Sequence, residues 1–381
     1  MSYVYKMEFL KLAGIALHEL GKYAYTKHFD VESFWSRCIK VNIIYTKFFQ
    51  CVASKYNYDY DIHHIPYTQD EVNVPYCDGC NDFTIIGSGL ISIVFESVKD
   101  GNKIIIKTKR RNINKRIHSS LNYLRKIIFF VDKLYSIPTI KRSYFEITNM
   151  FYTQLDFLNE IENHKKFKSL VQYKSIRIPD LIESECNSDR IVMTKLDGIP
   201  ISTLNEAEQK VCSGLLSRMI IDCILTHGFI HGDLHTGNIL FQPDSIGIID
   251  FGLMIQLTPN EITNLSSALQ HFYLKNYKEG VDCLMNFIEP SEIKELLSPE
   301  VIDDIKDFII HTYKKSFGLQ NCFHVSDVME INRKVSKHGL MLSPVFTKII
   351  VAFHSIESVF FNLSTTPNDI SLIALEMLLR E

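Results

Sequence analysis

The sequence predicts an α+β protein of two lobes, preceded by an N-terminal helical extension. Residues 1–60 have helix-like apolar spacing, and a polar, turn-rich stretch follows over 61–82. Short runs rich in β-branched residues begin at Phe83, and beyond about residue 200 the pattern is mainly helical. Strands with a small helical insert, followed by helices, favour the α+β class. We therefore expect an extension over 1–82, a first lobe over 83–196 and a helical second lobe over 197–381.

The first lobe is expected to open with three short strands. Their runs read FTIIGSG, ISIVFESV and NKIIIKTK, and Asp100-Gly101 between the last two is a strong signal for a hairpin turn. Apolar residues recur at helical spacing from Ser119 to Tyr135, and one further helix is expected over Phe151 to Phe167. A last strand, DRIVMTKL, ends at the turn Asp197-Gly198.

The second lobe is expected to begin with a long helix. Asn205 and Glu208 have the spacing of a capping box, the helix runs to His227, and Gly228 is well placed as its C-terminal cap. Near the end of the sequence, Val345 to Leu363 is strongly apolar but carries two charged residues and a histidine. A membrane-spanning helix needs about 20 mostly uncharged residues, so this stretch is read as a buried helix.

Composition narrows the class of protein. The 381 residues are 46% hydrophobic and 22% charged, as in a soluble globular protein. The net charge of -3 gives no reason to expect a nucleic-acid partner. Nine cysteines without a preceding secretory signal favour a reduced, intracellular chain. The helical stretch from Phe9 to Leu20 leaves peripheral membrane association open.

Two motifs carry the functional argument. The first reads His231-Gly-Asp-Leu-His-Thr-Gly-Asn238, and the second, Ile249-Asp-Phe-Gly252, begins eleven residues later. Between them, ILFQPDSIGII reads as a hairpin that can bring the two polar ends together.

The chemistry of phosphoryl transfer explains these residue types. Moving the γ-phosphoryl group of ATP needs metal ions on the phosphates and a carboxylate that orients the attacking group. Asp233 and Asn238 have the D-x-x-x-x-N spacing of a kinase catalytic loop, which predicts Asp233 as the base and Asn238 as a metal ligand. Asp250 is predicted to hold Mg²⁺. The alternative, that each aspartate only caps a turn, is disfavoured by the order and spacing of both motifs.

The upstream half of the site is predicted from a glycine loop and a lysine. Gly87 to Val94 reads G-x-G-x-x-S-x-V between two strands, and its glycines allow close approach to phosphate. Lys107 follows thirteen residues after Val94, where it would reach the α- and β-phosphates. As the alternative, it is an ordinary lysine at a strand end, and Lys109, Arg110 and Arg111 are a solvated basic cluster. The residues expected to contact the nucleotide here are Ile86, Gly87, Ser88, Gly89, Leu90, Ile91, Ser92, Val94 and Lys107.

Glu160 is predicted to pair with Lys107. Asp156 and Glu160 are four residues apart and would share a helix face, whereas Glu162 would point elsewhere. Met193 to Leu196 would form the hinge that offers backbone groups to adenine, with Met193 and Lys195 among the nucleotide-binding residues.

With these residues in view, the chain resembles the UbiB/aarF-domain (ADCK) family of atypical protein-kinase-like proteins from about residue 40 onward. The catalytic-loop motif looks like the family's H-A-D-P-H-P-G-N, and Gln154-Leu-Asp-Phe looks like its E-x-D motif. Met193-Thr-Lys-Leu-Asp-Gly-Ile-Pro200 resembles its hinge followed by D-G-x-P. The resemblance implies a two-lobed protein-kinase-like fold that uses ATP and Mg²⁺.

The resemblance also implies a regulatory element. Lys47-Phe-Phe-Gln50 looks like the family's K-x-G-Q signature, which implies that Lys47 occupies the cleft and disfavours ordinary protein-kinase activity. Three departures bear on this restraint: Phe49 replaces the glycine, Gln154 replaces the glutamate of E-x-D, and Gly87-Ser-Gly replaces an alanine-rich loop. The residues expected to regulate are Lys47, Gln50, Gln154 and Asp156.

We therefore expect an atypical kinase or ATPase that transfers or hydrolyses the γ-phosphate. After Gly252 the chain enters a helical pattern near Thr258 with no A-P-E motif, and Gly232 stands where an arginine would precede Asp233. These features favour a small-molecule or lipid-linked substrate, and the family implies isoprenoid lipid and coenzyme Q metabolism at membranes. The alternatives are a nucleotide-binding pseudokinase scaffold and, less favoured, a typical protein kinase.

A C-x-x-C sequence lies outside this scheme. Cys77 and Cys80, with His63 and His64 upstream, supply four residue types that can bind zinc. Plain turn cysteines are the favoured interpretation, and a zinc site or a redox pair are the alternatives.

Overall fold

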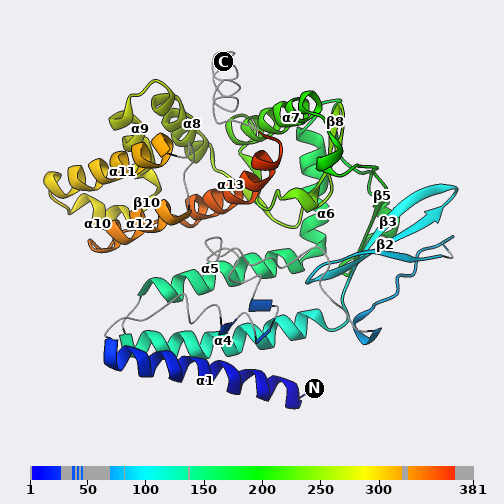
Figure 1. Ribbon diagram of the computed structural model, residues 1–381, viewed down its shortest axis with the longest axis horizontal. Helices are drawn as coiled ribbons and strands as arrows, with labels where there is room; N and C mark the ends of the chain where they lie inside the picture. The colour runs from blue at the N-terminus through cyan, green and yellow to red at the C-terminus, as the bar shows by residue number, and fades with distance from the viewer. Residues whose placement is uncertain are drawn as a thin grey trace. The chain divides into compact units, whose positions relative to one another are not determined.

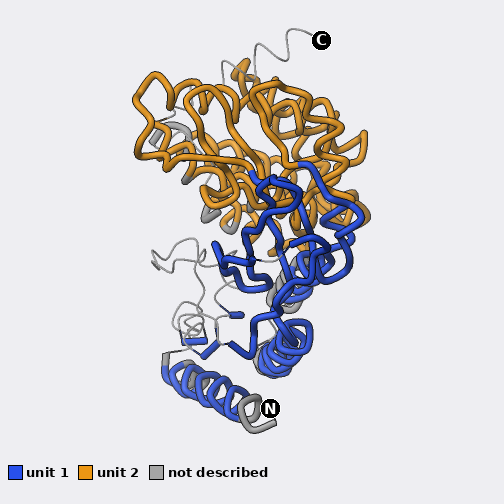
Figure 2. Tube along the Cα trace, turned by 90° about the vertical axis from the view of Figure 1, so that its right-hand side faces the viewer, with its two compact units in different colours: residues 1–161, 180–195 blue, residues 162–179, 196–381 orange. Residues whose placement is uncertain are grey.

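The computed structural model describes residues 2–26, 37–38, 41–42, 44–45, 69–80, 82–135, 138–319 and 325–364. The chain forms two compact units, shown in Figure 2. Unit 1 comprises Met1–Ile161 and Asp180–Lys195, and unit 2 comprises Glu162–Pro179 and Leu196–Glu381. The domain boundaries expected from the sequence stay predictions.

Unit 1 contains a four-stranded antiparallel sheet (Figure 1). The strands are β1 (Thr84–Ser88), β2 (Ser92–Lys99), β3 (Asn102–Lys109) and β5 (Arg190–Thr194), and they lie in the order β1-β2-β3-β5. The predicted hairpin joins β2 to β3 through Asp100 and Gly101, whose φ angles are 50° and 79°. Positive φ at both central residues is what a two-residue hairpin turn needs, so this local prediction is confirmed.

Among the described residues, the long helices of unit 1 are α1 (Ser2–Thr26), α4 (Ile113–Tyr135), α5 (Pro138–Leu155) and the start of α6 (Phe157–Leu170). Helices α1 and α4 lie side by side in Figure 1 and pack together. The prediction of one helix over Phe151 to Phe167 is wrong, because the chain breaks at Asp156. Its Oδ1 accepts hydrogen bonds from the amides of Leu158 (3.1 Å) and Asn159 (3.2 Å), so Asp156 caps α6 and does not continue α5.

Unit 2 begins with the rest of α6 and continues with α7 (Glu206–Leu225). Asn205 and Glu208 form the predicted capping box. The helix ends at Leu225, before the predicted His227, and its C-terminal cap is Thr226 and not Gly228, which has a positive φ of 56° in the turn that follows. The strands β7 (Ile239–Gln242) and β8 (Ser245–Ile248) form the predicted antiparallel hairpin between the two motifs. A short strand, β4 (Ile176–Arg177), pairs parallel with β8.

The remainder of unit 2 is mainly helical, as predicted. Its elements are β6 (Phe229–His231), β9 (Met254–Gln256), α8 (Pro259–Tyr273), α9 (Tyr277–Leu284), β10 (Ile288–Glu289), α10 (Ser291–Glu295), α11 (Pro299–Leu319), α12 (Val325–Ser336), β11 (Met341–Leu342) and α13 (Pro344–Asn362). Within the described ranges, α13 alone is long and apolar enough to cross a membrane, judged by length and composition only. It buries Ile349, Ala352, Ile356 and Val359 in unit 2, and a core helix passes the same test.

Candidate active site

Two short strands bring the predicted catalytic aspartates into neighbouring loops of unit 2. Strand β6 pairs antiparallel with β9, and His231 lies opposite Met254. The pairing extends one step further, because the Gly232 amide donates to the Leu253 carbonyl at 2.8 Å. Asp233 follows β6 directly and Asp250 lies just before β9, so the ladder sets the two loops side by side.

His231 joins these two loops through its ring. Its Nδ1 accepts a hydrogen bond from the Asp233 amide at 3.2 Å. The other nitrogen, Nε2, therefore carries the proton and donates to the backbone carbonyl of Asp250. Burial lowers the pKa of His231 below its ordinary value, in keeping with a neutral ring that accepts at one nitrogen and donates at the other.

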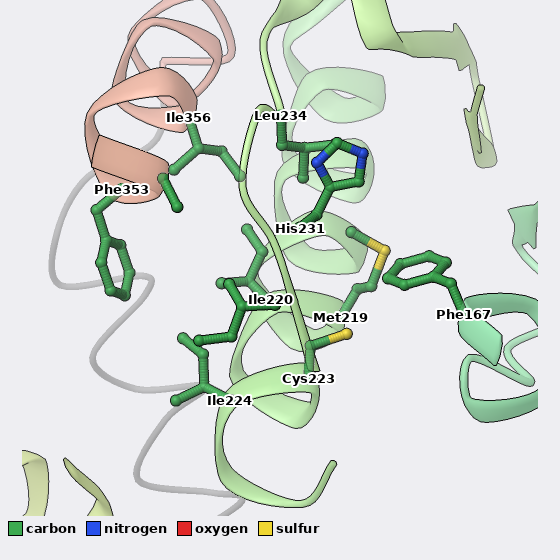
Figure 3. A pocket seen from close by; sticks show the side chains of 11 residues that line it. Phe167, Met219, Ile220, Cys223, Ile224, His231, Leu234, Phe353 and Ile356 are labelled. Atoms are coloured by element: carbon green, nitrogen blue, oxygen red, sulfur yellow. The ribbon is translucent and has the colours of Figure 1, made fainter. Parts of the chain in front are cut away.

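The environment behind His231 explains this neutrality. Figure 3 shows a small apolar pocket against which the ring lies, between α6, α7, β6 and α13. Burial also raises the pKa of the Cys223 thiol, which lines the pocket, to about 12, so that side chain is uncharged too. The lining residues are Phe167, Met219, Ile220, Cys223, Ile224, Ile230, His231, Leu234, Ala352, Phe353 and Ile356.

Asn238 turns back onto the aspartate loop. Its Nδ2 donates to the Asp233 carbonyl at 2.8 Å, which leaves the carboxamide oxygen as the group that would face a cation. The Asp250 carboxylate accepts a hydrogen bond from the Gly252 amide at 3.0 Å. The Asp233 carboxylate is 28% exposed, with His235 Nε2 3.9 Å from its Oδ1. The two loops thus combine an accessible carboxylate, that of Asp233, with two side chains whose oxygen atoms can bind a cation, Asn238 and Asp250.

These donors suit a magnesium ion. Mg²⁺ prefers hard oxygen ligands and is commonly held by one or two carboxylates together with substrate phosphates and water. Among the described residues, no group of three or more histidine, cysteine or acidic side chains is placed to hold a metal by itself. A cation at Asp250 and Asn238 would therefore take its remaining ligands from a nucleotide and from water.

The phenylalanine of the D-F-G motif anchors the second loop. Phe251 is 1% exposed, and its ring centroid lies 4.5 Å from that of His164 and 5.3 Å from that of Phe167, both on α6. Asn163, also on α6, donates its Nδ2 to the Phe251 carbonyl at 3.2 Å. The backbone next to Asp250 is therefore held against α6 both by ring packing and by a hydrogen bond.

In unit 1, the predicted lysine and glutamate are in contact. Lys107 lies on β3, and its Nζ is 2.6 Å from Glu160 Oε1 in the first turn of α6. Both side chains are largely buried, at 12% and 4% exposure. The Lys107 ammonium also lies 5.4 Å from the centre of the Phe157 ring. The geometry is that of a fixed ion pair, while the catalytic role of the two residues stays a prediction.

The basic cluster after Lys107 is not solvated throughout. Lys109 and Arg110 are only 8% and 4% exposed, so that interpretation is wrong for both, whereas Arg111 is exposed. Burial lowers the pKa of Lys109, whose Nζ lies 4.9 Å from the Phe157 ring centre. The Arg110 side chain donates hydrogen bonds to Ser88 and Gly89 of the glycine loop and to Glu71.

The predicted loop and hinge residues have varied surroundings. Ile86 is 43% exposed beside a register shift in β1, whereas the side chains of Leu90 and Ile91 belong to the core of unit 1. Met193 is buried on β5. Lys195 donates its amide to the Lys103 carbonyl at 3.1 Å and its Nζ to Glu96 at 2.6 Å, so both donors are engaged within the sheet.

The remaining sequence predictions have mixed outcomes. Lys47, Gln50, His63 and His64 lie outside the described residues. Gln154 lies on α5, and Asp156 is the N-cap that precedes α6, the helix that carries Glu160. The Cys77 and Cys80 sulfur atoms are 3.0 Å apart in an apolar cluster, where burial raises the pKa of Cys77 to about 12.

Sequence reasoning missed the roles of His231 and Arg110. A signal for His231 was present, because a histidine opens the motif and directly follows the apolar pair Phe229-Ile230. For Arg110 no local signal exists, since its acidic partner Glu71 lies 39 residues upstream.

Comparison with known proteins bears on both units. Residues 82–283 match the ABC1 atypical kinase-like domain family. An uncharacterized protein of the hydrogenase 1 5′ region of Clostridium pasteurianum is 28% identical over 276 residues, covering 68% of this chain and 52% of that protein. The probable protein kinase UbiB of Shewanella pealeana is 25% identical over 232 residues, covering 55% and 42%. An aarF domain-containing protein kinase of Arabidopsis thaliana, described as chloroplastic, is 21% identical over 275 residues, covering 70% and 38%.

The chain thus spans about half or less of the length of these relatives. Among solved structures, Rv3197 of Mycobacterium tuberculosis, determined in complex with erythromycin, aligns with a TM-score of 0.52 at 17% identity. The alignment covers 98% of this chain and 97% of that one. At this identity the likeness concerns the fold, which is kinase-like.

Proposed function

Because this chain belongs to the ABC1 atypical kinase-like family, which includes the UbiB and aarF-domain kinases, we propose that it binds ATP with Mg²⁺ and transfers or hydrolyses the γ-phosphate. The observation that carries the proposal is the joining of the two aspartate loops by His231. One neutral ring accepts from the Asp233 amide and donates to the Asp250 carbonyl. An arrangement that served only to cap two turns would not need this bridge.

Each residue has a role that its surroundings support. Asp233, partly exposed, would orient the attacking hydroxyl group or water and take its proton. Asn238 and Asp250 would hold Mg²⁺, which when bound neutralises the phosphates. Lys107, kept in place by Glu160 at 2.6 Å, would contact the α- and β-phosphates.

The acceptor is proposed to be a small molecule, a lipid-linked molecule or water. Helix α8 begins at Pro259, directly after β9, so the chain from the D-F-G motif to α8 leaves no length for a long activation segment. Peptide substrates of ordinary protein kinases dock on such a segment, so this feature disfavours a protein acceptor.

Thermal unfolding with and without ATP and Mg²⁺ tests the nucleotide site. At a hundredfold excess over its dissociation constant, a ligand stabilises the folded protein by about 2.7 kcal/mol. We expect a magnesium-dependent rise of the unfolding temperature in the wild type and its loss in Asp250→Asn. Asp244→Asn, an exposed aspartate in the β7–β8 turn, is the matched control and should behave as wild type.

Turnover separates the enzyme from its rival, a nucleotide-binding pseudokinase scaffold. We expect phosphate release or transfer that disappears in Asp233→Asn while ATP binding survives. Binding without turnover in the wild type would favour the scaffold. No binding in the wild type would refute the proposed function.

We further propose that unit 1 associates peripherally with an anionic membrane surface. Helix α1 exposes Leu10 (62%), Leu17 (63%) and Tyr25 (95%), while its two acids, Glu8 and Glu19, are 7% and 1% exposed. The outward face therefore combines apolar side chains with lysines and no exposed carboxylate among its described side chains. This combination suits an interfacial helix on acidic lipid.

Vesicle co-sedimentation tests this surface. The wild type should bind vesicles that contain phosphatidylglycerol and bind phosphatidylcholine vesicles weakly, because the lysines need an anionic surface. Leu10→Glu with Leu17→Glu should abolish binding and leave ATP-dependent stabilisation intact. Equal sedimentation of the variant and the wild type would contradict the assignment.

A further inference from the structure

A buried arginine next to the glycine loop makes hydrogen bonds to three of the loop residues, Ser88, Gly89 and Ile91. The Arg110 Nε donates to the Gly89 carbonyl at 2.9 Å, and its Nη2 donates to Ser88 Oγ at 2.7 Å. Its backbone amide donates to the Ile91 carbonyl, also at 2.9 Å. The loop also closes on itself, since the Gly89 amide donates to the Ser92 carbonyl at 2.9 Å.

The arginine is held in turn from outside the loop. Its Nη1 donates to Glu71 Oε2 at 2.6 Å, and the two side chains are 3% and 16% exposed. Glu71 also pairs with Arg116 and accepts, at its backbone carbonyl, from the Arg111 amide at 2.9 Å. A guanidinium presents its donors in a rigid, planar fork, so these contacts fix both its position and its plane.

We infer that Arg110 is a positioning residue for the nucleotide: it holds the loop in the conformation that receives the phosphates, with Glu71 as its anchor. The inference rests on the proposed ATP binding. A charge so deeply buried is costly unless it is fully paired, and here the pairing is made to the loop backbone itself. The buried Arg110 side chain therefore keeps its hydrogen bonds only while the loop keeps this conformation.

The orientation of one peptide unit shows how the clamp acts. In a trans peptide the carbonyl and the following N–H point in opposite directions. Arg110 draws the Gly89 carbonyl toward itself, so the Leu90 N–H points away from the arginine. Without the clamp this peptide is able to turn over and present a carbonyl oxygen to the phosphates, which would repel them. With the clamp, a donor faces the side from which an anion can approach.

The test compares Arg110→Lys with Arg111→Lys. The first variant keeps the charge and loses the fork, while the second makes the same change at the exposed neighbour. The dissociation constant for ATP with Mg²⁺ should rise about tenfold in Arg110→Lys, the change expected when one charge-assisted hydrogen bond is lost. It should not change in Arg111→Lys. A lower unfolding temperature without ATP, combined with an unchanged dissociation constant, would mean a merely structural role and would overturn the inference.

Hydrogen exchange of the loop amides gives an independent readout. The Gly89 amide should exchange faster in Arg110→Lys than in the wild type and in Arg111→Lys, whether or not nucleotide is present. If Arg110→Lys does not fold, Glu71→Gln keeps the arginine and weakens only its anchor, so a smaller effect of the same kind is expected. If the wild type binds no ATP, the proposed function fails, and exchange alone then decides whether the clamp exists. Unchanged exchange in both variants would refute it.

Discussion

Replacement by alanine is expected to have opposite effects on stability in the glycine loop and at Gly232, in the catalytic-loop motif. A Cβ at Gly87 would lie 3.6 Å from Val94 Cβ, and one at Gly89 would lie 3.8 Å from the Ser92 carbonyl oxygen, which are ordinary contacts. Neither glycine has the positive φ that disfavours alanine. A Cβ at Gly232, however, would lie 2.9 Å from Leu253 Cγ and 3.0 Å from the Leu253 carbonyl oxygen.

These distances set the expected changes in the free energy of unfolding. Alanine at Gly87 or Gly89 restricts the unfolded chain without strain in the folded one, so stability should rise by about 0.4–1 kcal/mol per site. Gly232→Ala forces β6 and β9 apart or displaces Leu253, which should cost about 1–3 kcal/mol. The absence of an arginine before Asp233 thus has a steric reason, since this position has no room for a side chain.

Urea denaturation of the three single variants measures the contrast. The rise of the unfolding temperature caused by ATP and Mg²⁺, measured in parallel, shows whether Gly87 and Gly89 contribute to nucleotide binding although the fold does not require glycine at these positions. A Gly232→Ala protein as stable as the wild type would refute the packing argument. So would a loss of more than about 1 kcal/mol in Gly87→Ala or Gly89→Ala.

Two further predictions concern His231 and the cap of α6. Burial lowers the pKa of His231 in the folded state. Below the unfolded-state pKa of about 6.5, the unfolded state therefore binds more protons, and the free energy of unfolding decreases as the pH decreases, by at most about 1.4 kcal/mol per pH unit. His231→Gln should remove this part of the slope in urea titrations at about pH 7.5 and about pH 5.5, and an unchanged slope would contradict the assignment. Asp156→Ala should cost about 0.5–2 kcal/mol through loss of the N-cap, and Asp156→Ser should restore most of it. Equal urea midpoints for Asp156→Ala and the wild type would show that the cap contributes nothing.

The sequence predicted best those features whose causes are local. The turn at Asp100-Gly101 and the capping box that begins at Asn205 depend on neighbours within a few residues, and both are present. The break at Asp156 was missed because the apolar spacing continues across it. An aspartate on a helix surface and an aspartate at a helix cap look alike until the backbone is known.

The site was predictable to the extent that motif order fixes it. Lys107 and Glu160 are 53 residues apart, and their contact followed from the order of the motifs and not from any spacing rule. The bridge from His231 to the Asp250 carbonyl joins a ring to a backbone atom 19 residues away, and no residue type marks such an acceptor. Arg110 looked like surface charge for the same reason, since its burial depends on Glu71 and on loop carbonyls.

The chain after the D-F-G motif is held too firmly to act as a phosphorylation switch. Leu253, Ile255 and Leu257 are 7%, 3% and 2% exposed, and backbone hydrogen bonds of 2.8 Å link the segment to Gly232 and Gly228. Detaching it would expose three apolar side chains at about 1.5–3 kcal/mol each, a total comparable with the whole stability of a domain. A phosphate group gains only one to three charge-assisted hydrogen bonds, which does not offset that loss. Regulation of the proposed activity is therefore expected to act on the glycine loop and its arginine clamp and not on this segment.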